Sequence, residues 1–460
     1  MSDGTRGGDI AVAIVSVITG GIVVIVVSVL VYKCCKLRMM RKYGGLPPPP
    51  VLPLVETTRT AAAVATPISV AGVATAAAMA SVNHSSITSS SIYGALDVVK
   101  NRPVRFSSLQ LQELTGNYAE KLGAGGFGVV FRGQIPVPDH HASGGSLLPV
   151  AVKVLGSNLG RRAEEQFMAE IGTIGRTSHV NLVRLYGFCF DADLKALVYE
   201  FMPNGSLDRH LFFSPDSGGK KKHQLGFDKL YEVAVGTAKA IRYLHDDCER
   251  RIIHYDIKPG NVLLDEAFRP KVADFGLARL LERERTHVTA TGGGRGTPGY
   301  AAPELWMAAP ATSKCDVYSY GMLLFEILGR RRNYVEVDGR ESEEGESAAD
   351  ERWYPRWAWR RMERGETEAL VARALAGGGG KGKEGRRKVE RMCAVALWCV
   401  QYRPEDRPAM SAVVRMLESD EDVAAPAVSP FAHLETHHLG SRTFTLDTTT
   451  TTTTTFGSTA

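Results

Sequence analysis

The sequence is poor in cysteine and carries little net charge. It has seven cysteines among 460 residues, and no two of them are separated by the two residues typical of metal-binding pairs. We therefore expect neither a zinc site nor a disulfide framework, and the free thiols fit a reducing compartment. The formal net charge is only +5 at pH 7, and the basic residues occur in local groups rather than in one stripe. This balance gives no reason to expect a nucleic-acid partner.

Charged residues are also missing from one long, mostly apolar stretch, residues 10–32. Its length is at least the ~20 residues that a helix needs to cross a bilayer. A cleaved signal peptide is the alternative, but its apolar region would be shorter and its start basic, whereas Asp3, Arg6 and Asp9 precede this run. Five lysines and arginines follow within residues 33–42, and such residues stay in the cytosol. We expect residues 1–9 outside, a single transmembrane helix at residues 10–32, and the rest of the chain inside.

The next segment, residues 33–100, begins basic and then becomes rich in proline, alanine, serine and threonine. This composition buries too little apolar surface to offset its ordering entropy, so we expect a disordered linker. Cys34 and Cys35, at the cytosolic edge, are either palmitoylation sites or an idle pair. Residues 61–80 are uncharged and about as long as a membrane span, but they contain Pro67 and little leucine, isoleucine or phenylalanine. We therefore expect no second span.

A polar loop between two apolar runs occupies residues 252–265. The apolar runs should be buried and hold the loop rigidly, with His254, Asp256, Lys258 and Asn261 facing a cleft. In such a loop an aspartate can accept the proton of an attacking hydroxyl, a lysine can neutralise a transferring phosphoryl group, and an asparagine can bind a metal ion. A solvated turn is the alternative when the loop is considered alone.

Other motifs accompany this loop in a defined order. Asp-Phe-Gly at 274–276 offers a carboxylate for Mg²⁺, and Ala-Pro-Glu follows at 302–304; a glycine-rich run at 123–130 and Val-Ala-Val-Lys at 150–153 come before. A dinucleotide-binding turn is the alternative for the glycine run, but that turn opens a helix, whereas this run leads into a strand. The order and spacing of these motifs resemble the protein kinase family, and the resemblance covers residues 117–417.

The resemblance implies an α+β fold with two lobes, a small β-rich N-lobe and a larger α-helical C-lobe, preceded here by the transmembrane helix. It implies ATP and Mg²⁺ as cofactors, and Lys258-Pro259 resembles the serine/threonine kinases. Asp256 and Lys258 would be catalytic, and Asn261 and Asp274 would bind Mg²⁺. The implied nucleotide-binding residues are Leu122, Gly123, Ala124, Gly125, Gly126, Phe127, Gly128, Val130, Ala151, Lys153, Glu170, the gatekeeper Tyr199, and Glu200 and Met202 with their backbone against adenine.

Lys153 lies in an apolar run that is expected to form a buried strand at residues 149–155. Burying its charge there is costly unless the lysine is paired with an acid. Glu170, within a helical pattern at residues 164–174, is the expected partner. The resemblance assigns Lys153 to the α- and β-phosphates and Glu170 to the ion pair that orients it. The alternative, a lysine that snorkels from a strand edge, is disfavoured by the motifs around it.

Several stretches narrow the resemblance to plant receptor-like kinases of the Pelle type. Residues 179–189 resemble the segment after helix C in these proteins, and Tyr-Pro-Arg-Trp at 354–357 resembles the rust-resistance kind. Closing helices are expected at residues 389–399 and 410–417. One departure is Tyr255, where many kinases carry an arginine that grips a phosphate on the activation segment. We hypothesise that activity does not depend on such a contact, since tyrosine offers no cationic fork.

The resemblance also implies three supporting contacts. Thr297 should bond to the acid and lysine of the catalytic loop, Glu304 should pair with Arg407, and Asp316 should hold the backbone of that loop. Beyond the closing helices, residues 418–460 end in a threonine run and are expected to form a disordered tail.

The sequence thus predicts a membrane-anchored serine/threonine kinase of the receptor-like type, in the plasma membrane with its kinase domain cytoplasmic. With only about nine residues outside, it would work beside a ligand-binding co-receptor or as a cytoplasmic relay. The alternative is a pseudokinase scaffold that binds signalling partners without turnover. A scaffold needs none of Lys153, Glu170, Asp256, Asn261 and Asp274, and all five are present.

The predicted topology can be tested at Asn83, which begins an Asn-His-Ser glycosylation acceptor. Glycans are added only on the lumenal side, and a single span keeps Asn83 in the cytosol. The full-length protein from eukaryotic cells should therefore keep its mass after endoglycosidase treatment. A mass shift that disappears in Asn83→Gln would instead show a second membrane span.

Overall fold

The computed structural model describes residues 103–125, 128–137, 146–156, 161–212, 224–282, 296–307, 310–335, 352–380 and 382–433. The predicted span at residues 10–32 and the predicted linker at residues 33–100 lie outside these ranges. Within the ranges, no helix combines the length and the apolar content needed to cross a membrane.

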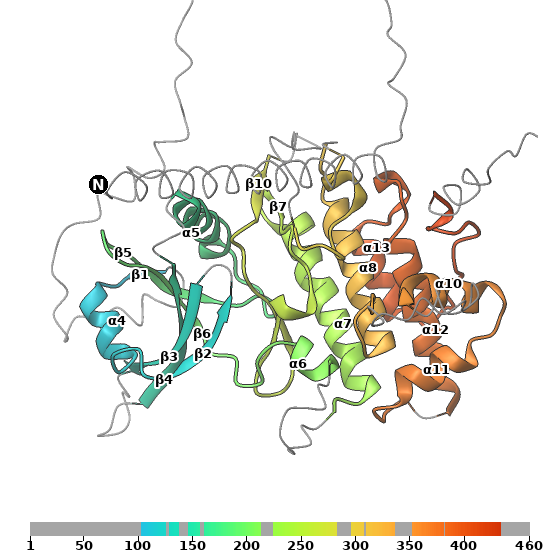
Figure 1. Cartoon of the computed structure of the whole chain (residues 1–460), viewed down its shortest axis with the longest axis horizontal. Helices are drawn as coiled ribbons and strands as arrows, with labels where there is room; N and C mark the ends of the chain where they lie inside the picture. Colours follow the sequence, from blue (N-terminus) through green and yellow to red (C-terminus); the bar gives the residue numbers. More distant parts are fainter. Residues whose placement is uncertain are drawn as a thin grey trace, which may run out of the picture. The chain divides into compact units, whose positions relative to one another are not determined.

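A six-stranded sheet forms the first part of the described chain (Figure 1). Its spatial order is β1-β5-β6-β4-β3-β2, and every neighbouring pair is antiparallel except β1 and β5, which are parallel. Runs of valine favour these strands because β-branched side chains pack well on a pleated surface. The strands are β1 (Val104–Arg105), β2 (Lys121–Gly125), β3 (Gly128–Val137), β4 (Ser146–Leu155), β5 (Leu185–Phe190) and β6 (Lys195–Glu200).

Two helices, α4 (Ser108–Leu114) and α5 (Arg161–Thr173), cover the sheet. Alternate residues of β6 separate the two faces, since successive strand side chains point to opposite sides. Ala196 and Val198 join a buried cluster with Leu111 of α4, whereas Leu197 joins the cluster that contains Phe167 of α5. The helices therefore lie on opposite faces, and a 3₁₀ turn (Ile174–Arg176) continues α5 toward the helical part.

The chain enters the sheet before the start of the predicted domain. Val104 pairs with Gly187 of β5, where a Cβ atom would lie 2.4 Å from both the Val104 carbonyl oxygen and the Phe106 ring. Only glycine fits this approach. The helix that follows, α4, begins with a capping box in which Ser107 and Gln110 satisfy each other's backbone N–H groups.

The second part of the described chain is helical. Its central helix, α8, is mostly apolar and is buried from Cys315 to Gly329 with the sole exception of Tyr318, as expected for a helix inside a core. All five described cysteines are buried. The helices are α6 (Asp208–Leu211), α7 (Phe227–Arg242) with a π turn (Tyr243–Asp247), α8 (Lys314–Gly329), α10 (Tyr354–Glu363), α11 (Glu368–Leu375), α12 (Gly382–Cys399) and α13 (Met410–Glu418), with 3₁₀ turns at Pro259–Asn261, Pro303–Leu305 and Pro404–Asp406.

Two short ribbons lie between the sheet and these helices. The strands β7 (Arg251–Ile253) and β10 (Arg279–Leu281) pair antiparallel, as do β8 (Val262–Leu264) and β9 (Pro270–Val272). The predicted catalytic loop runs from β7 to β8. Apolar residues of both strands are buried, so the loop is fixed at each end.

Helix α12 begins earlier than the predicted closing helix at residues 389–399. Glycines and alternating charges before residue 389 favour a loop by local pattern. In the structure, Arg386 forms ion pairs with Glu390 one turn on and with Glu368 of α11, at 3.4 and 2.9 Å. Paired charges of this kind stabilise the first turns of a helix.

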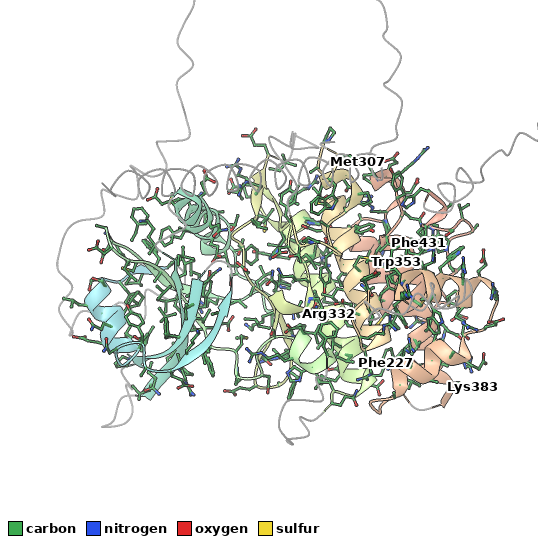
Figure 2. All side chains as sticks on the ribbon, viewed as in Figure 1. Phe227, Met307, Arg332, Trp353, Lys383 and Phe431 are labelled. Carbon is green, nitrogen blue, oxygen red and sulfur yellow. The ribbon has the colours of Figure 1, made fainter. Side chains whose placement is uncertain are left out.

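Residues 419–433 were predicted to belong to a disordered tail, but in the structure they pack against the helical part of the chain. Phe431 is 1% exposed, and its ring lies 4.7 Å from that of Trp353 (Figure 2). The Trp398 indole N–H donates to the Ala424 carbonyl oxygen at 2.9 Å. One aromatic anchor in a proline- and serine-rich stretch gives no periodic signal, so the packing was not predictable from local pattern. Residues 434–460 lie outside the described ranges.

A buried ion pair fixes the end of the helical part. Arg407 is 1% exposed and donates to both carboxylate oxygens of Glu304, at 2.6 and 2.9 Å. It also donates to the carbonyl oxygens of Gln401 and Tyr402. The predicted pair is confirmed, and the same guanidinium ties together segments that are far apart in the sequence.

Replacing Arg407 by methionine should lower the free energy of unfolding by about 3–5 kcal/mol, because it leaves the buried Glu304 carboxylate without its partner. Urea unfolding of the full chain, followed by tryptophan fluorescence, measures the change. Arg176→Met, at an exposed arginine, is the control and should change stability by less than about 0.5 kcal/mol. Equal stabilities for the two variants would contradict the expected role of the pair.

Candidate active site

The loop between β7 and β8 is held by one carboxylate of α8. Asp316 is fully buried and accepts the backbone N–H groups of His254 and Tyr255, both at 2.8 Å. It also contacts the His245 ring at 2.9 Å. Tyr255 has a φ of 66°, a left-handed conformation that is unfavourable for a bulky residue. Asp316 therefore fixes a strained turn directly before Asp256, and the expected support is confirmed.

Asp256 is the centre of a hydrogen-bonded group. Its Oδ1 accepts the Thr297 hydroxyl at 2.5 Å, and its Oδ2 accepts the Lys258 ammonium at 2.7 Å and the Asn261 side-chain N–H at 2.9 Å. Lys258 also donates to the Thr297 hydroxyl oxygen at 2.8 Å. The predicted contact of Thr297 with the acid–lysine pair is thus confirmed. Because the Asn261 nitrogen points at Asp256, its amide oxygen points away from that carboxylate.

A second cluster joins the sheet, α5 and the segment after β9. Lys153 of β4 lies 2.6 Å from the Glu170 carboxylate and 2.8 Å from that of Asp274. The predicted Lys153–Glu170 pair is confirmed, and Asp274 is a second partner that was not predicted. Glu170 is 1% exposed, and its Oε2 finds no hydrogen-bond partner among the described residues. One ammonium thus serves two carboxylates, one of which, Glu170, is almost completely buried.

The two carboxylates hold protons differently. Burial raises the pKa of Glu170 from 4.5 to about 7, and the Asp274 charge adds to the rise although Lys153 opposes it. Burial alone would raise the pKa of Asp274, but the charge and hydrogen bond of Lys153 outweigh it and lower that pKa to about 2. Burial would likewise lower the pKa of Lys153, yet the two carboxylates raise it above its ordinary value. Asp274 therefore stays ionised while Glu170 is the group that takes up a proton.

Two residues beside Asp274 shape this cluster. The buried Phe275 ring lies 4.8 Å edge-to-face from the His254 ring, so it packs inward as predicted. A Cβ atom at Gly276 would lie 3.3 Å from Oε1 of Glu170. Asp274 itself has a φ of 66°. The carboxylate is therefore presented by a strained turn packed directly against the other acid of the cluster.

The glycine-rich hairpin forms one wall of the site. Strands β2 and β3 pair up to Gly125 and Gly128. A Cβ atom at Gly128 would lie 2.1 Å from the Val154 carbonyl oxygen, which explains glycine there. Register places Val130 opposite Lys153. Leu122 and Val130 are half-buried, Gly123 lies in β2 with Ala124, and Gly126 and Phe127 fall outside the described residues.

The segment after β6 forms the other wall. Ala151 of β4 lies opposite Tyr199 of β6. The Glu200 carboxylate accepts the Arg184 backbone N–H at 2.7 Å and the Lys271 ammonium at 2.9 Å, so its side chain is fully engaged in support. Met202 is buried. By strand register and alternation, Gly123, Val130, Ala151 and Tyr199 lie on the same face of the sheet as Lys153. Ala124 and Glu200 alternate to the opposite face.

Comparison with protein families gives one decisive match. The family model for protein tyrosine and serine/threonine kinases matches residues 117–417. The chain belongs to the protein kinase family. Its kinase domain contains the two clusters described above, one around Lys153 of β4 and one around Asp256 in the loop between β7 and β8.

The similar proteins are receptor-like serine/threonine kinases of plants. The chain is 45% identical over 323 residues to a G-type lectin S-receptor-like serine/threonine-protein kinase of Arabidopsis thaliana, covering 70% of this chain and 35% of that protein. It is 39% identical over 319 residues to the rust resistance kinase Lr10 of Triticum aestivum, covering 69% and 46%. The chain therefore spans less than half the length of these relatives.

Sequence reasoning missed part of the kinase site. The Tyr300 hydroxyl donates to the buried Glu326 at 2.6 Å and accepts from Arg332 at 3.1 Å. Glu326, a buried acid in the mostly apolar helix α8, was the available signal, because buried carboxylates are rarely unpaired. His245, on the other side of Asp316, was also missed. Among the described residues, no cluster of three metal-ligating side chains occurs.

The raised pKa of Glu170 predicts a pH dependence of stability. Because the folded pKa of about 7 lies above the ordinary 4.5, the contribution of this group is fully present below pH 4.5 and is lost as pH rises through 7. Relative to Glu170→Gln, the wild type should lose about 3 kcal/mol of unfolding free energy over this window. Urea unfolding of both proteins at a series of pH values measures the difference, and parallel curves would contradict it.

Proposed function

We propose that this protein is a serine/threonine protein kinase that transfers the γ-phosphate of ATP to protein substrates. The observation that carries the proposal is the hydrogen-bonded group of Asp256, Lys258 and Thr297, with 2.5–2.8 Å contacts. It places an ionisable acid and a fixed cation together on one rigid loop. A proton acceptor beside a charge-neutralising lysine is what phosphoryl transfer to a hydroxyl requires.

The residues present fit ATP and Mg²⁺. Lys153 supplies a buried cation for phosphate oxygens, and the glycine hairpin brings backbone close to the space above it. Asn261 and Asp274 supply two oxygen donors, which suits a small cation that takes few protein ligands and completes its shell with phosphate oxygens and water. When bound, the cation neutralises the charge that develops on the phosphates.

The catalytic step follows from the contacts of Asp256. Its carboxylate would accept the proton of the attacking serine or threonine hydroxyl, as that oxygen bonds to the γ-phosphorus and the bond to the leaving ADP oxygen breaks. Lys258 would stabilise the moving phosphoryl group. Thr297 and Asn261 position the acid, since each donates to one of its oxygens. The strained Tyr255 turn, held by Asp316, keeps this orientation before substrate binds.

The alternative function is a pseudokinase scaffold that binds partners without turnover. The formed Lys153–Glu170 ion pair favours catalysis, because a scaffold has no use for a buried charge that is costly to desolvate. The same holds for the acid, lysine and amide of the catalytic loop, which satisfy one another at hydrogen-bond distance.

We further propose that the kinase is anchored in the plasma membrane by residues 10–32, with its domain on the cytoplasmic side. Support comes from the uncharged length of this stretch and the basic residues that follow it. The relatives are named as receptor-like kinases, which agrees with a role in signalling at a membrane.

Phosphate transfer by the full chain, with labelled ATP, Mg²⁺ and a serine- or threonine-containing protein, tests the proposed activity. Asp256→Asn should lower the rate by about 10²–10⁴-fold, because it removes the proton acceptor but keeps the shape. Asp193→Asn, at an exposed acid of the N-terminal part, is the matched control and should leave the rate unchanged.

The outcomes separate the two candidate functions. Transfer by the wild type that is lost in Asp256→Asn supports the kinase. A folded wild type that binds ATP but transfers nothing to itself or to added protein would contradict the kinase and support the scaffold.

A further inference from the structure

Arg332 is an exposed arginine whose guanidinium is nevertheless held in place. Its central carbon lies 3.9 Å from the centre of the Phe212 ring, and Nη1 donates to the Tyr300 hydroxyl at 3.1 Å. An exposed arginine ordinarily samples many rotamers. Here a cation–π contact and a hydrogen bond select one position, so the charge is presented at a defined place.

The backbone around Arg332 is anchored on both sides. Arg330, in a left-handed conformation with a φ of 48°, donates from its side chain to the carbonyl oxygens of Ala374 and Leu225. Asn333 is buried, and its backbone N–H donates to Glu326 at 3.2 Å. Arg332 lies between these two anchored residues, and its own side chain is exposed.

This position adjoins the proposed catalytic group. Tyr300, which contacts Arg332, donates its backbone N–H to the carbonyl oxygen of Thr297, and the Thr297 hydroxyl bonds to Asp256. Phe212 directly follows α6, whose first residue Asp208 has its carboxylate 3.9 Å from a Cβ placed on Gly260 of the catalytic loop. Figure 2 shows Arg332 on the helical part, near the middle of the view. The arginine is thus one short segment away from the acid that would receive the substrate hydroxyl.

The charge of Arg332 is not neutralised by an ion pair with any described residue. Glu326, which contacts Tyr300 as Arg332 does, is 2% exposed and already accepts the Tyr300 hydroxyl and the Asn333 N–H. Among the described residues, no carboxylate forms an ion pair with Arg332. A guanidinium has five N–H donors in a fork that matches carboxylate and phosphate, and its contact with Tyr300 uses one nitrogen. Most of the fork therefore remains for a ligand.

We propose that Arg332 determines substrate specificity by receiving an anionic side chain, a carboxylate or a phosphate, close to the phosphorylated serine or threonine. This rests on the proposed kinase activity. An extended peptide advances about 3.3 Å per residue, so the short path from Asp256 through Thr297 and Tyr300 places the anion within about five residues of the acceptor. A pre-positioned arginine loses little entropy on binding, which favours a defined preference over general attraction.

The test uses the full chain and synthetic peptides with one central serine. In turn, each position from five before to five after the serine carries aspartate, phosphoserine, alanine or lysine. At one position, the wild type should use the aspartate or phosphoserine peptide about tenfold better in kcat/KM than the alanine peptide, as expected for a charge-assisted hydrogen bond. The two anionic series distinguish an acidic substrate from one that was phosphorylated beforehand.

Two variants identify the residue responsible. In Arg332→Ala the ratio of anionic to alanine peptide should fall to about one, and in Arg332→Glu the preference should pass to the lysine peptide at the same position. Arg415→Ala, at an exposed arginine of α13, should keep the wild-type ratio. Because each ratio uses the same variant for both peptides, partial loss of folded protein cancels.

The outcomes separate this inference from the proposed function. Transfer without any anionic preference, or a preference that survives in Arg332→Glu, overturns the role of Arg332 and leaves the kinase intact. If no peptide is phosphorylated, fluorescence anisotropy of the labelled phosphoserine peptides decides. If the peptides bind and Arg332→Glu weakens this binding about tenfold, the anion site is supported and only the kinase activity is contradicted. If binding is the same in Arg332→Glu, the anion site is contradicted.

Discussion

The buried carboxylate of Asp316 is the contact on which the site depends. It lies inside α8, the helix that is buried on nearly all sides, and from there it holds two backbone N–H groups of the loop that carries Asp256. A carboxylate without these partners would be costly in such a core, and the loop without the carboxylate would relax from its left-handed turn. Core and catalytic loop therefore stabilise each other.

A cluster of charged side chains links the two lobes in a similar way. Lys153 belongs to the sheet, Glu170 to α5 and Asp274 to the segment between β9 and β10, yet one ammonium joins all three. The apolar cluster on the α5 face of the sheet also contains Phe275, next to Asp274, and continues into the C-terminal helices. The charge cluster adds a polar connection that is maintained only when α5 and the Asp274 turn are both in place. Geometry at the nucleotide wall is thus sensitive to both lobes.

Local spacing explains why much of the site was predictable. Asp256, Lys258 and Asn261 lie within six residues, so one rigid loop brings them together, and a lysine in an apolar strand required an acidic partner such as Glu170. The second partner, Asp274, was foreseen only as a metal ligand. A carboxylate shared between lysine and metal depends on how two distant segments approach, which no local pattern encodes.

The parts of the fold that were not predicted depend on contacts between segments whose sequences show no clear periodicity. Phe431 is a single aromatic in a polar stretch, and its packing on Trp353 involves chain that is far away in sequence. The first turns of α12 are glycine-rich, and their stabilising partners include Glu368 of another helix. The fold class and the helical order followed from motifs, whereas the limits of the folded part did not.

The close approach at Gly187 has a consequence for how such a domain can vary. The missing methyl group at this position is what allows β1 to join the sheet, since a Cβ would meet both Val104 and Phe106. The glycine hairpin of β2 and β3 lies at the opposite edge, with β6 and β4 between it and β5. A single mutation there would therefore detach the incoming chain from the domain without altering any residue of the site. The attachment of the incoming chain therefore depends on the glycine at position 187, whereas the chemistry depends on residues elsewhere in the domain.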